Sequence, residues 1–234
     1  MIEEMLAYNR EFVRSRGYEK FQTSKYPDKK IAILTCMDTR LVELLPAALG
    51  IRNGDVKLIK NAGGMITGPF DSAVRSLLVA IVELGVEEVM VIGHDDCGVA
   101  HINADTMIRH LIRRGISQDH IDMMRYCGVD FEAWLRGFDC VESSVAETVE
   151  LLRNHPLMPA DVTIRGNGAA MRCSPAGMIA SSLEEAEDLG QRTAEVTHKG
   201  ELTDSVTLDT ALRFYRNQRK SGCRWCSHHP RASG

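Results

Sequence analysis

The sequence is organised around residues 31–40, which read IAILTCMDTR. Residues 31–35 form an apolar run, as expected of a strand that is buried in a sheet. Three reactive side chains follow at alternate positions: Cys36, Asp38 and Arg40. A thiol, a carboxylate and a guanidinium directly after a buried strand indicate a functional site at the end of that strand.

A second apolar run is followed by reactive side chains in the same way. Residues 89–92 form this run, and His94 and Cys97 come after it. Because the carboxyl ends of parallel strands meet at one edge of a sheet, we expect Cys36, His94 and Cys97 to lie close together. Two thiols and an imidazole favour zinc over magnesium or calcium, and three protein ligands leave a fourth position open. Cys97 lies near the start of a helical stretch, and a helix N-terminus and a cation would both lower the pKa of its thiol.

Asp38 and Arg40 have a separate expected role beside these three ligands. Zinc can ionise a water in its open position to hydroxide near neutral pH. We expect Arg40 to hold Asp38 by a forked hydrogen bond, which keeps the carboxylate off the metal. Asp38 can then accept the hydrogen of the zinc hydroxide and orient its lone pair toward an electrophile. Without Arg40, Asp38 could take the fourth position and close the site.

Apolar runs and helical patterns alternate along the first part of the chain. Strands are expected at residues 31–35, 56–59, 89–92 and 157–164. Helices are expected at residues 2–13, 41–49, 74–84, 107–112, 121–124 and 141–152, with an irregular section at 129–138. Apolar strands separated by helices predict an α/β fold with a mainly parallel central sheet flanked by helices. The first helix is amphipathic and precedes the first strand, so it must pack outside the sheet or on another subunit.

Two glycines follow the second expected strand, in the sequence Asn61-Ala62-Gly63-Gly64. Glycine lets the backbone approach a neighbouring loop or a ligand closely, because it has no Cβ. A plain tight turn accounts for the same two residues equally well.

The composition argues against several classes of function. The chain has 234 residues and a formal net charge of −4, with basic residues scattered until its last quarter, so no nucleic-acid partner is expected. The N-terminus has no long apolar segment behind it, so we expect no secretory signal, no membrane span and a cytoplasmic location. Seven cysteines are an odd number, and in a reducing cytosol they favour metal ligation or simple burial over disulfides.

Three motifs in this order resemble those of the β-class carbonic anhydrases, especially their compact prokaryotic branch. They are Cys-x-Asp-x-Arg, Asn-Ala-Gly-Gly and Gly-His-x-Asp-Cys-Gly, one after each of the first three strands. The resemblance implies zinc on Cys36, His94 and Cys97, and an Asp38–Arg40 dyad. It also implies reversible hydration of carbon dioxide to bicarbonate and a proton. A further implication is a homodimer, or a higher homo-oligomer, in which the N-terminal helix embraces the partner.

The resemblance covers about residues 1–165, which we predict to be one zinc-dependent domain. Asp95 departs from the family pattern, since relatives usually have a small polar residue or a histidine there. After Arg165 the short apolar strand and tight turn of relatives are missing, so residues 166–234 are predicted to be an atypical extension. This extension contains a Cys-x-x-Cys sequence followed by histidines, which could bind a second metal through Cys223, Cys226 and His228. A loosely attached tail is favoured, because no second pair of potential ligands lies nearby in the sequence.

Two other functions use the same site residues. Zinc hydroxide can also attack carbonyl sulfide or carbon disulfide, and access to the pocket would decide between these substrates and carbon dioxide. The other alternative is a non-catalytic, zinc-stabilised binding protein, in which the metal only holds the fold or Asp38 fills the open position. The presence of both Asp38 and Arg40 argues against this second alternative.

Overall fold

The computed structural model describes residues 1–167, 182, 184–185 and 188. The elements in this part of the chain follow in the order α1 (Ile2–Arg14), η1 (Glu19–Phe21), β1 (Ile31–Cys36), η2 (Thr39–Leu41), α2 (Leu44–Leu49), β2 (Val56–Asn61), η3 (Ala62–Gly64), α3 (Ser72–Val82), β3 (Glu88–Ile92), α4 (Ala104–Arg113), α5 (Gln118–Tyr126), α6 (Phe131–Trp134), α7 (Val141–Arg153) and β4 (Thr163–Gly166), where η marks a 3-10 helix. The alternation of strands and helices confirms the predicted α/β class.

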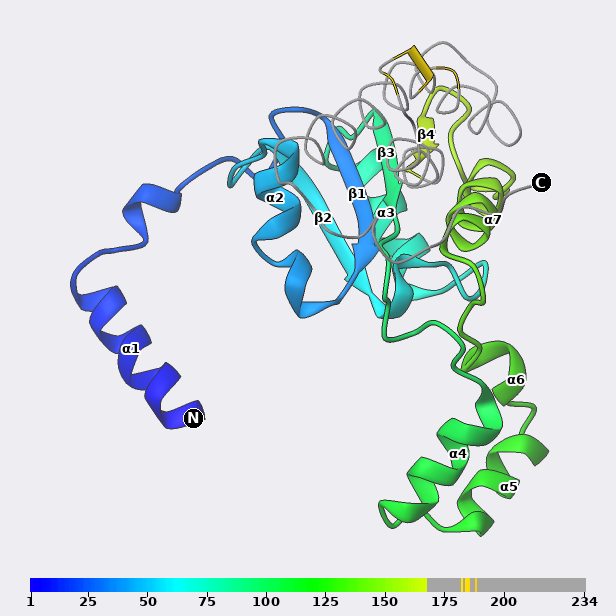
Figure 1. Cartoon of the computed structure of the whole chain (residues 1–234). Coiled ribbons are helices and arrows are strands. Elements are labelled where there is room, and N and C mark those ends of the chain that lie inside the picture. The colour runs from blue at the N-terminus through cyan, green and yellow to red at the C-terminus, as the bar shows by residue number, and fades with distance from the viewer. Residues whose placement is uncertain (168–181, 183, 186–187, 189–234) are drawn as a thin grey trace.

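One parallel sheet forms the centre of the protein, with the strand order β2-β1-β3-β4 (Figure 1). In β1, Cys36 pairs with Asn61 of β2, and Thr35 pairs with Ile92 of β3. The carboxyl ends of these three strands therefore meet at one edge of the sheet, where the sequence predicts the site.

Aliphatic side chains of the strands hold helices on the sheet. Ala32 and Leu34 of β1 belong to a buried cluster that includes Leu77 of α3 and Leu152 of α7. On the other side, Ile33 packs in a cluster with residues of η2 and α2. Because both faces of the strands are covered, their residues read as continuous apolar runs.

Two helical parts lie away from the sheet (Figure 1). Helix α1 occupies the predicted range and has no buried residue. Helices α4, α5 and α6 form a projection with a small core of their own, around Ile108, Ile121 and Phe131. Among the described residues, no helix has both the length and the apolar character needed to cross a bilayer.

Three elements differ from the sequence prediction. The helix expected at 41–49 is divided into η2 and α2, since Pro46 has no N–H to donate to the carbonyl of residue 42. The section expected to be irregular contains α6, whose N-terminus is capped by the Asp130 side chain. Strand β4 is Thr163–Gly166 and not 157–164, because residues 155–162 form turns, in which Met158 donates to the His155 carbonyl.

The shift of β4 bears on the predicted domain boundary. A boundary after residue 165 falls inside this strand, whose last residue is Gly166. Asn167 continues the attachment, since its backbone N–H donates to the Val91 carbonyl at 3.1 Å. Most of the predicted extension, including its Cys-x-x-Cys sequence, lies outside the described residues.

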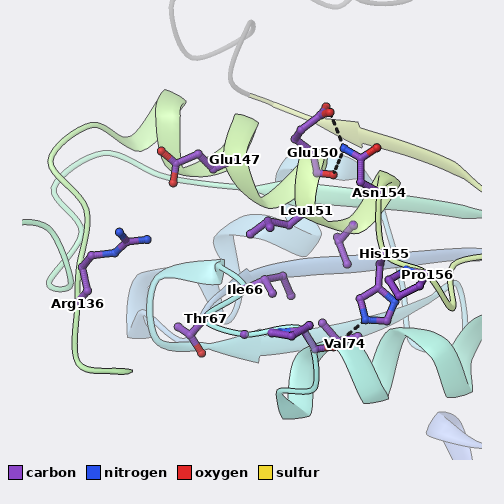
Figure 2. A pocket seen from close by; sticks show the side chains of 13 residues that line it. Ile66, Thr67, Val74, Arg136, Glu147, Glu150, Leu151, Asn154, His155 and Pro156 are labelled. Atoms are coloured by element: carbon purple, nitrogen blue, oxygen red, sulfur yellow. Dashed lines mark hydrogen bonds between the residues drawn. The ribbon is translucent and has the colours of Figure 1, made fainter. Parts of the chain in front are cut away.

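A cavity of about 690 Å³ lies between residues 66–69, the start of α3 and α7 (Figure 2). Its one histidine is His155, whose Nε2 donates to the Pro69 carbonyl at 2.7 Å. The Nδ1 of the same ring accepts from the Leu157 N–H at 3.2 Å. Both ring nitrogens therefore have a partner, Nε2 in the loop at Pro69 and Nδ1 at Leu157, and neither is free to bind a metal.

The glycine turn after β2 lies against the end of β1. Gly64 has a φ of 64°, and a Cβ at this position would lie 2.8 Å from the backbone nitrogen of Cys36. Real Cβ atoms do not approach backbone so closely. Close approach of two backbone segments, and not only a tight turn, therefore requires glycine at position 64.

We predict that Gly64→Ala lowers the free energy of unfolding by about 2 kcal/mol or more, because the left-handed backbone and the contact with Cys36 both oppose a side chain. Urea denaturation monitored by circular dichroism measures this change. Gly68→Ala is the matched control, since a Cβ there meets nothing within 4 Å. A loss for Gly64→Ala no larger than that of the control would contradict the packing argument.

Candidate metal centre

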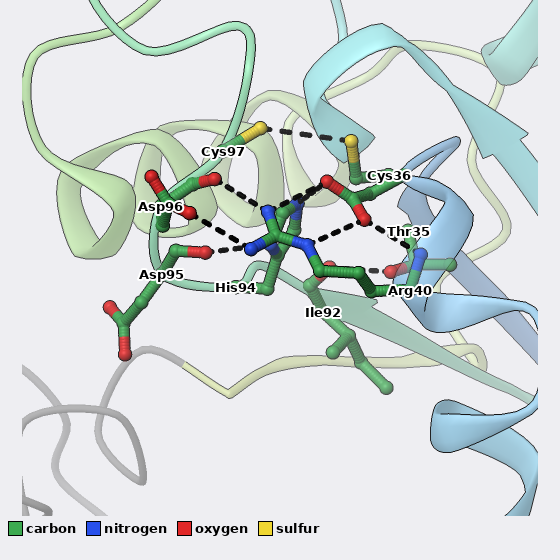
Figure 3. Close-up of polar contacts among 9 residues, drawn as sticks. Thr35, Cys36, Arg40, Ile92, His94, Asp95, Asp96 and Cys97 are labelled. Atoms are coloured by element: carbon green, nitrogen blue, oxygen red, sulfur yellow. Dashed lines mark hydrogen bonds and ion pairs between the residues drawn. The ribbon is translucent and has the colours of Figure 1, made fainter.

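Three potential ligands, from the end of one strand and the loop after another, converge at the carboxyl edge of the sheet (Figure 3). Cys36 ends β1, and the loop after β3 carries His94 and Cys97. The ligand atoms of these residues all lie within 4.8 Å of one another. Both cysteine side chains are buried, and their sulfur atoms are 3.7 Å apart.

His94 is oriented so that one ring nitrogen faces this cluster. Its Nδ1 lies 2.8 Å from the backbone oxygen of Asp95. A carbonyl oxygen can only accept a hydrogen bond, so Nδ1 carries the hydrogen and Nε2 carries the lone pair. Nε2 is buried and has no hydrogen-bond partner among the described residues. A buried acceptor without a partner is costly unless a ligand occupies the space before it.

The donor set fits a tetrahedral metal ion. Zinc–sulfur bonds of about 2.3 Å at a tetrahedral angle put two sulfurs about 3.8 Å apart. The separation of the two cysteine sulfurs, 3.7 Å, agrees with this value. Cys36, His94 and Cys97 could therefore hold one metal ion together, with room for a fourth ligand.

The surroundings of Cys97 differ from the prediction. No helix begins at this residue, because α4 starts only at Ala104. Burial raises the pKa of the Cys97 thiol, and the neighbouring Cys36 thiol adds to the increase, while backbone hydrogen bonds from Val99 and Ala100 oppose it. The prediction that a helix N-terminus lowers this pKa is therefore wrong. The groups that oppose the increase are backbone N–H groups of the turn after Cys97.

Asp38 and Arg40 form the forked pair that the sequence predicts. The Nε of Arg40 donates to Oδ1 of Asp38, and its Nη2 donates to Oδ2, both at 2.9 Å. The backbone N–H of Arg40 also donates to Oδ1, at 2.8 Å. The hydrogen bonds from Arg40 hold the pKa of the Asp38 carboxyl well below its usual range. Asp38 is therefore a carboxylate at any ordinary pH, and it can accept but not donate.

The Asp38 carboxylate stands beside the cluster without closing on it. Its Oδ2 is 4.0 Å from Nε2 of His94, which is too long for a hydrogen bond. Oδ2 accepts one hydrogen bond, from Arg40, while Oδ1 accepts two. An acceptor with spare capacity thus lies next to the potential metal position.

Asp96 contacts the same arginine and was missed in the sequence reasoning. Nη1 of Arg40 donates to Oδ2 of Asp96 at 2.9 Å, and Nη2 donates to the Asp96 backbone oxygen at 2.6 Å (Figure 3). The hydrogen bonds that Arg40 donates to Asp38 and Asp96 raise the pKa of its guanidinium further above its usual range. The sequence signals for this contact are the two acidic residues between His94 and Cys97 and the place of Asp96 in the Gly-His-x-Asp-Cys-Gly motif.

Asn167 also supports the site and lies beyond the predicted domain boundary. Its side-chain amide pairs with Gly93, donating to the backbone oxygen at 3.0 Å and accepting from the N–H at 2.9 Å. Gly93 is buried and directly precedes His94. Asn167 therefore extends the contact of β4 with β3 beyond Gly166 and fixes the start of the ligand loop.

Comparison with known proteins gives matches to the part of the chain that holds the sheet and the candidate ligands. Residues 31–167 match the model of a protein family described as carbonic anhydrase. The chain is 51% identical over 166 residues to a Bacillus subtilis protein named "Putative carbonic anhydrase YtiB", covering 71% of this chain and 89% of the relative. It is 35% identical over 148 residues to a carbon disulfide hydrolase of Acidithiobacillus thiooxidans, covering 59% and 71% of the two chains.

A similar solved structure is the crystal structure of β-carbonic anhydrase isoform I from Trichomonas vaginalis. The match has a TM-score of 0.64 and 33% identity, and it covers 71% of this chain and 90% of the other.

We predict that Asn167→Ala lowers the free energy of unfolding by about 2 kcal/mol, because it leaves the buried N–H and carbonyl of Gly93 without partners. Urea denaturation measures the loss. Asn154→Ala is the control, since Asn154 also makes two amide hydrogen bonds, both to Glu150 at an exposed site. Equal losses in the two variants would show that the Gly93 contact has no special importance.

Proposed function

The chain belongs to the β-class carbonic anhydrase family, and on that basis we propose that it catalyses the reversible hydration of carbon dioxide to bicarbonate and a proton. The proposal assigns zinc to Cys36, His94 and Cys97, and it assigns catalytic roles to Asp38 and Arg40. The observation that carries it is the convergence of two thiols and an imidazole lone pair beside a carboxylate that is held off the cluster.

Zinc is the proposed metal because the three donors are soft or intermediate ligands. Thiolate sulfur and imidazole nitrogen suit zinc, whereas magnesium and calcium prefer oxygen. When bound, zinc supplies a Lewis acid that lowers the pKa of a water in its open position toward neutrality. The chain supplies the ligands, the orientation of their lone pairs and the exclusion of bulk water from the two buried sulfurs.

Asp38 orients the reacting water in this proposal. Its carboxylate stays ionised because of Arg40, so Oδ2 can only accept a hydrogen bond. A water that donates one hydrogen to Oδ2 has its lone pair directed away from Asp38, toward the space where carbon dioxide enters. The Asp38 carboxylate also repels bicarbonate, because both are negatively charged. This repulsion favours release of the product.

Arg40 prevents Asp38 from becoming a ligand itself. Two parallel hydrogen bonds from a guanidinium fix both the position and the plane of a carboxylate. Loss of these bonds would free Asp38 to turn toward the cluster, where Nε2 of His94 lies 4.0 Å from Oδ2, and to enter the fourth position. The Asp38–Arg40 dyad thus keeps the fourth metal position open. A non-catalytic, zinc-stabilised binding protein would not need an open position.

We predict that the zinc-loaded protein accelerates carbon dioxide hydration in a stopped-flow indicator assay. Asp38→Asn keeps its metal but loses about 10- to 100-fold in kcat/KM, because the amide is a weaker acceptor and its NH₂ group repels the water hydrogen. Cys36→Ala loses the metal, since a thiolate ligand is gone. Metal content is measured by atomic absorption on the same samples.

The outcome that opposes the proposal is equally specific. A wild-type protein with one zinc per chain and no rate above that of buffer would exclude carbonic anhydrase activity. Glu83→Gln serves as the matched control, because it removes a negative charge between the end of α3 and the start of β3, at the edge of the sheet opposite to the cluster.

Carbon disulfide hydrolysis is the second candidate, because a relative of this name shares 35% identity over 148 residues. Carbonyl sulfide would use the same chemistry. The reaction of carbon disulfide on this site would need the same ligands and the same acceptor at Asp38, so the ligand set does not discriminate. Release of hydrogen sulfide from carbon disulfide, assayed beside carbon dioxide hydration, separates the two substrates.

We also propose that the protein is a homodimer or a higher homo-oligomer, with α1 covering the partner. In the single chain α1 has no buried residue, and Met5 and Tyr8 are 72% and 76% exposed on one face. Such a row of exposed apolar side chains is typical of a helix that is buried in an assembly.

The cytoplasmic location of the protein stays a prediction.

Substitution of both Met5 and Tyr8 by Lys should convert the oligomer to a smaller species, seen in sedimentation velocity. The substitution leaves the fold of the single chain intact, because neither side chain is buried in it. Tyr126→Lys on α5 is the control, since Tyr126 is 93% exposed but lies outside α1. An unchanged sedimentation coefficient in the α1 variant would refute this role of the helix.

A further inference from the structure

We propose that Asp96 is a positioning residue: it anchors Arg40 to the loop that carries His94 and Cys97, so that Asp38 cannot turn into the open metal position. This inference rests on the proposed zinc site. The Asp96 side chain does not contact the three candidate ligands, and its proposed role is to keep the fourth metal position open.

The guanidinium of Arg40 is shared between two loops. Nε and Nη2 donate to the carboxylate of Asp38, which lies two residues earlier and caps the 3-10 helix η2. Nη1 and Nη2 bind the side chain and the backbone oxygen of Asp96, in the loop after β3. All four distances lie between 2.6 and 2.9 Å. Arg40 therefore links the Cys36 loop to the loop of the other two candidate ligands.

Asp38 alone does not fix Arg40. The two residues belong to one short turn, and the Arg40 side chain is 51% exposed. A long exposed side chain has many rotamers, so Arg40 could follow Asp38 toward the cluster without breaking the fork. A contact from the opposite loop removes this freedom, because Arg40 would have to leave Asp96 in order to follow.

The position of Asp38 shows why an anchor matters. Its Oδ2 already lies 4.0 Å from Nε2 of His94, so a short displacement brings a carboxylate oxygen into the cluster. A carboxylate is a good zinc ligand and would compete with the substrate water. Because Asp96 precedes Cys97 directly, the anchor moves together with the ligands and keeps the distance between Asp38 and the metal position constant.

The backbone conformation of Asp96 allows both of its contacts with Arg40. Asp96 has a φ of 51°, in the left-handed region that aspartate, asparagine and glycine tolerate best. From this conformation both its carbonyl and its carboxylate reach Arg40. The side chain is 90% exposed, so the carboxylate contributes a modest part of the anchoring.

Binding of azide to the cobalt-loaded, full-length protein tests the proposal. Azide binds an open metal position and changes the visible spectrum of Co²⁺, whereas a bound Asp38 blocks it. Asp96→Gly removes the side chain and preserves the left-handed backbone, and Asp96→Asn keeps an acceptor for Nη1. We expect azide to bind about fivefold more weakly to Asp96→Gly than to wild type, the size of one exposed charged contact, and Asp96→Asn to fall between the two.

Two further variants separate positioning from loop stability. Adding Asp38→Asn to Asp96→Gly should restore the azide affinity to that of Asp38→Asn alone, because the competing carboxylate is gone. Glu83→Gln, with the same loss of charge far from the site, should bind azide as wild type does. If Asp96→Gly weakens azide binding equally in the presence of Asp38→Asn, or if it has no effect on azide binding, the proposal is wrong.

The result is distinguishable from failure of the proposed function. A wild-type protein that binds cobalt and azide but does not hydrate carbon dioxide would refute the proposed activity and leave the role of Asp96 standing. An active wild type whose azide affinity is unaffected in Asp96→Gly would refute the role of Asp96 alone.

Discussion

Parallel pairing of β1 with β3 is the constraint on which the site depends. Thr35 is opposite Ile92 in this pairing, and the buried Thr35 hydroxyl donates to the Ile92 carbonyl at 2.9 Å. The two strands end at the same level, so Cys36 at the end of β1 faces the loop that leaves β3. A shift of this register by one residue would move Cys36 away from His94 and Cys97 and point its side chain to the other side of the sheet.

Burial and charge oppose each other around the three candidate ligands. Two buried thiols and a buried imidazole acceptor have few partners in the protein itself, and burial raises the pKa of Cys97. A divalent cation reverses this balance, because it favours thiolates and uses the lone pair of His94. The nearby carboxylate of Asp38 would itself be attracted to such a cation. Arg40 holds this carboxylate with a fork of hydrogen bonds and also donates to Asp96 in the second loop.

Residue types and their spacing predicted the class of fold and the candidate ligands. Apolar runs marked β1 and β3, and the pairing of parallel strands brought Cys36, His94 and Cys97 to one edge. Pattern reasoning was less accurate where packing decides. The apolar residues near Leu157 suggested a strand, yet Leu157 is 59% exposed in a turn. Cys97 was expected near the start of a helical stretch, but α4 begins only at Ala104, and a turn separates it from the ligand loop.

The sequence by itself determined which chemical groups are available and that strands carry them to a common edge, because alternation of apolar runs and helices follows from local periodicity. Only the tertiary structure decided which groups support them. Asp96 and Asn167 are 56 and 74 residues from their partners Arg40 and Gly93 along the chain, and no local pattern records such contacts. Gly64 is required because the backbone of Cys36 occupies the space of a side chain. Contacts of this kind arise when separate loops are brought together by the sheet, so they depend on the whole fold and not on neighbouring residues.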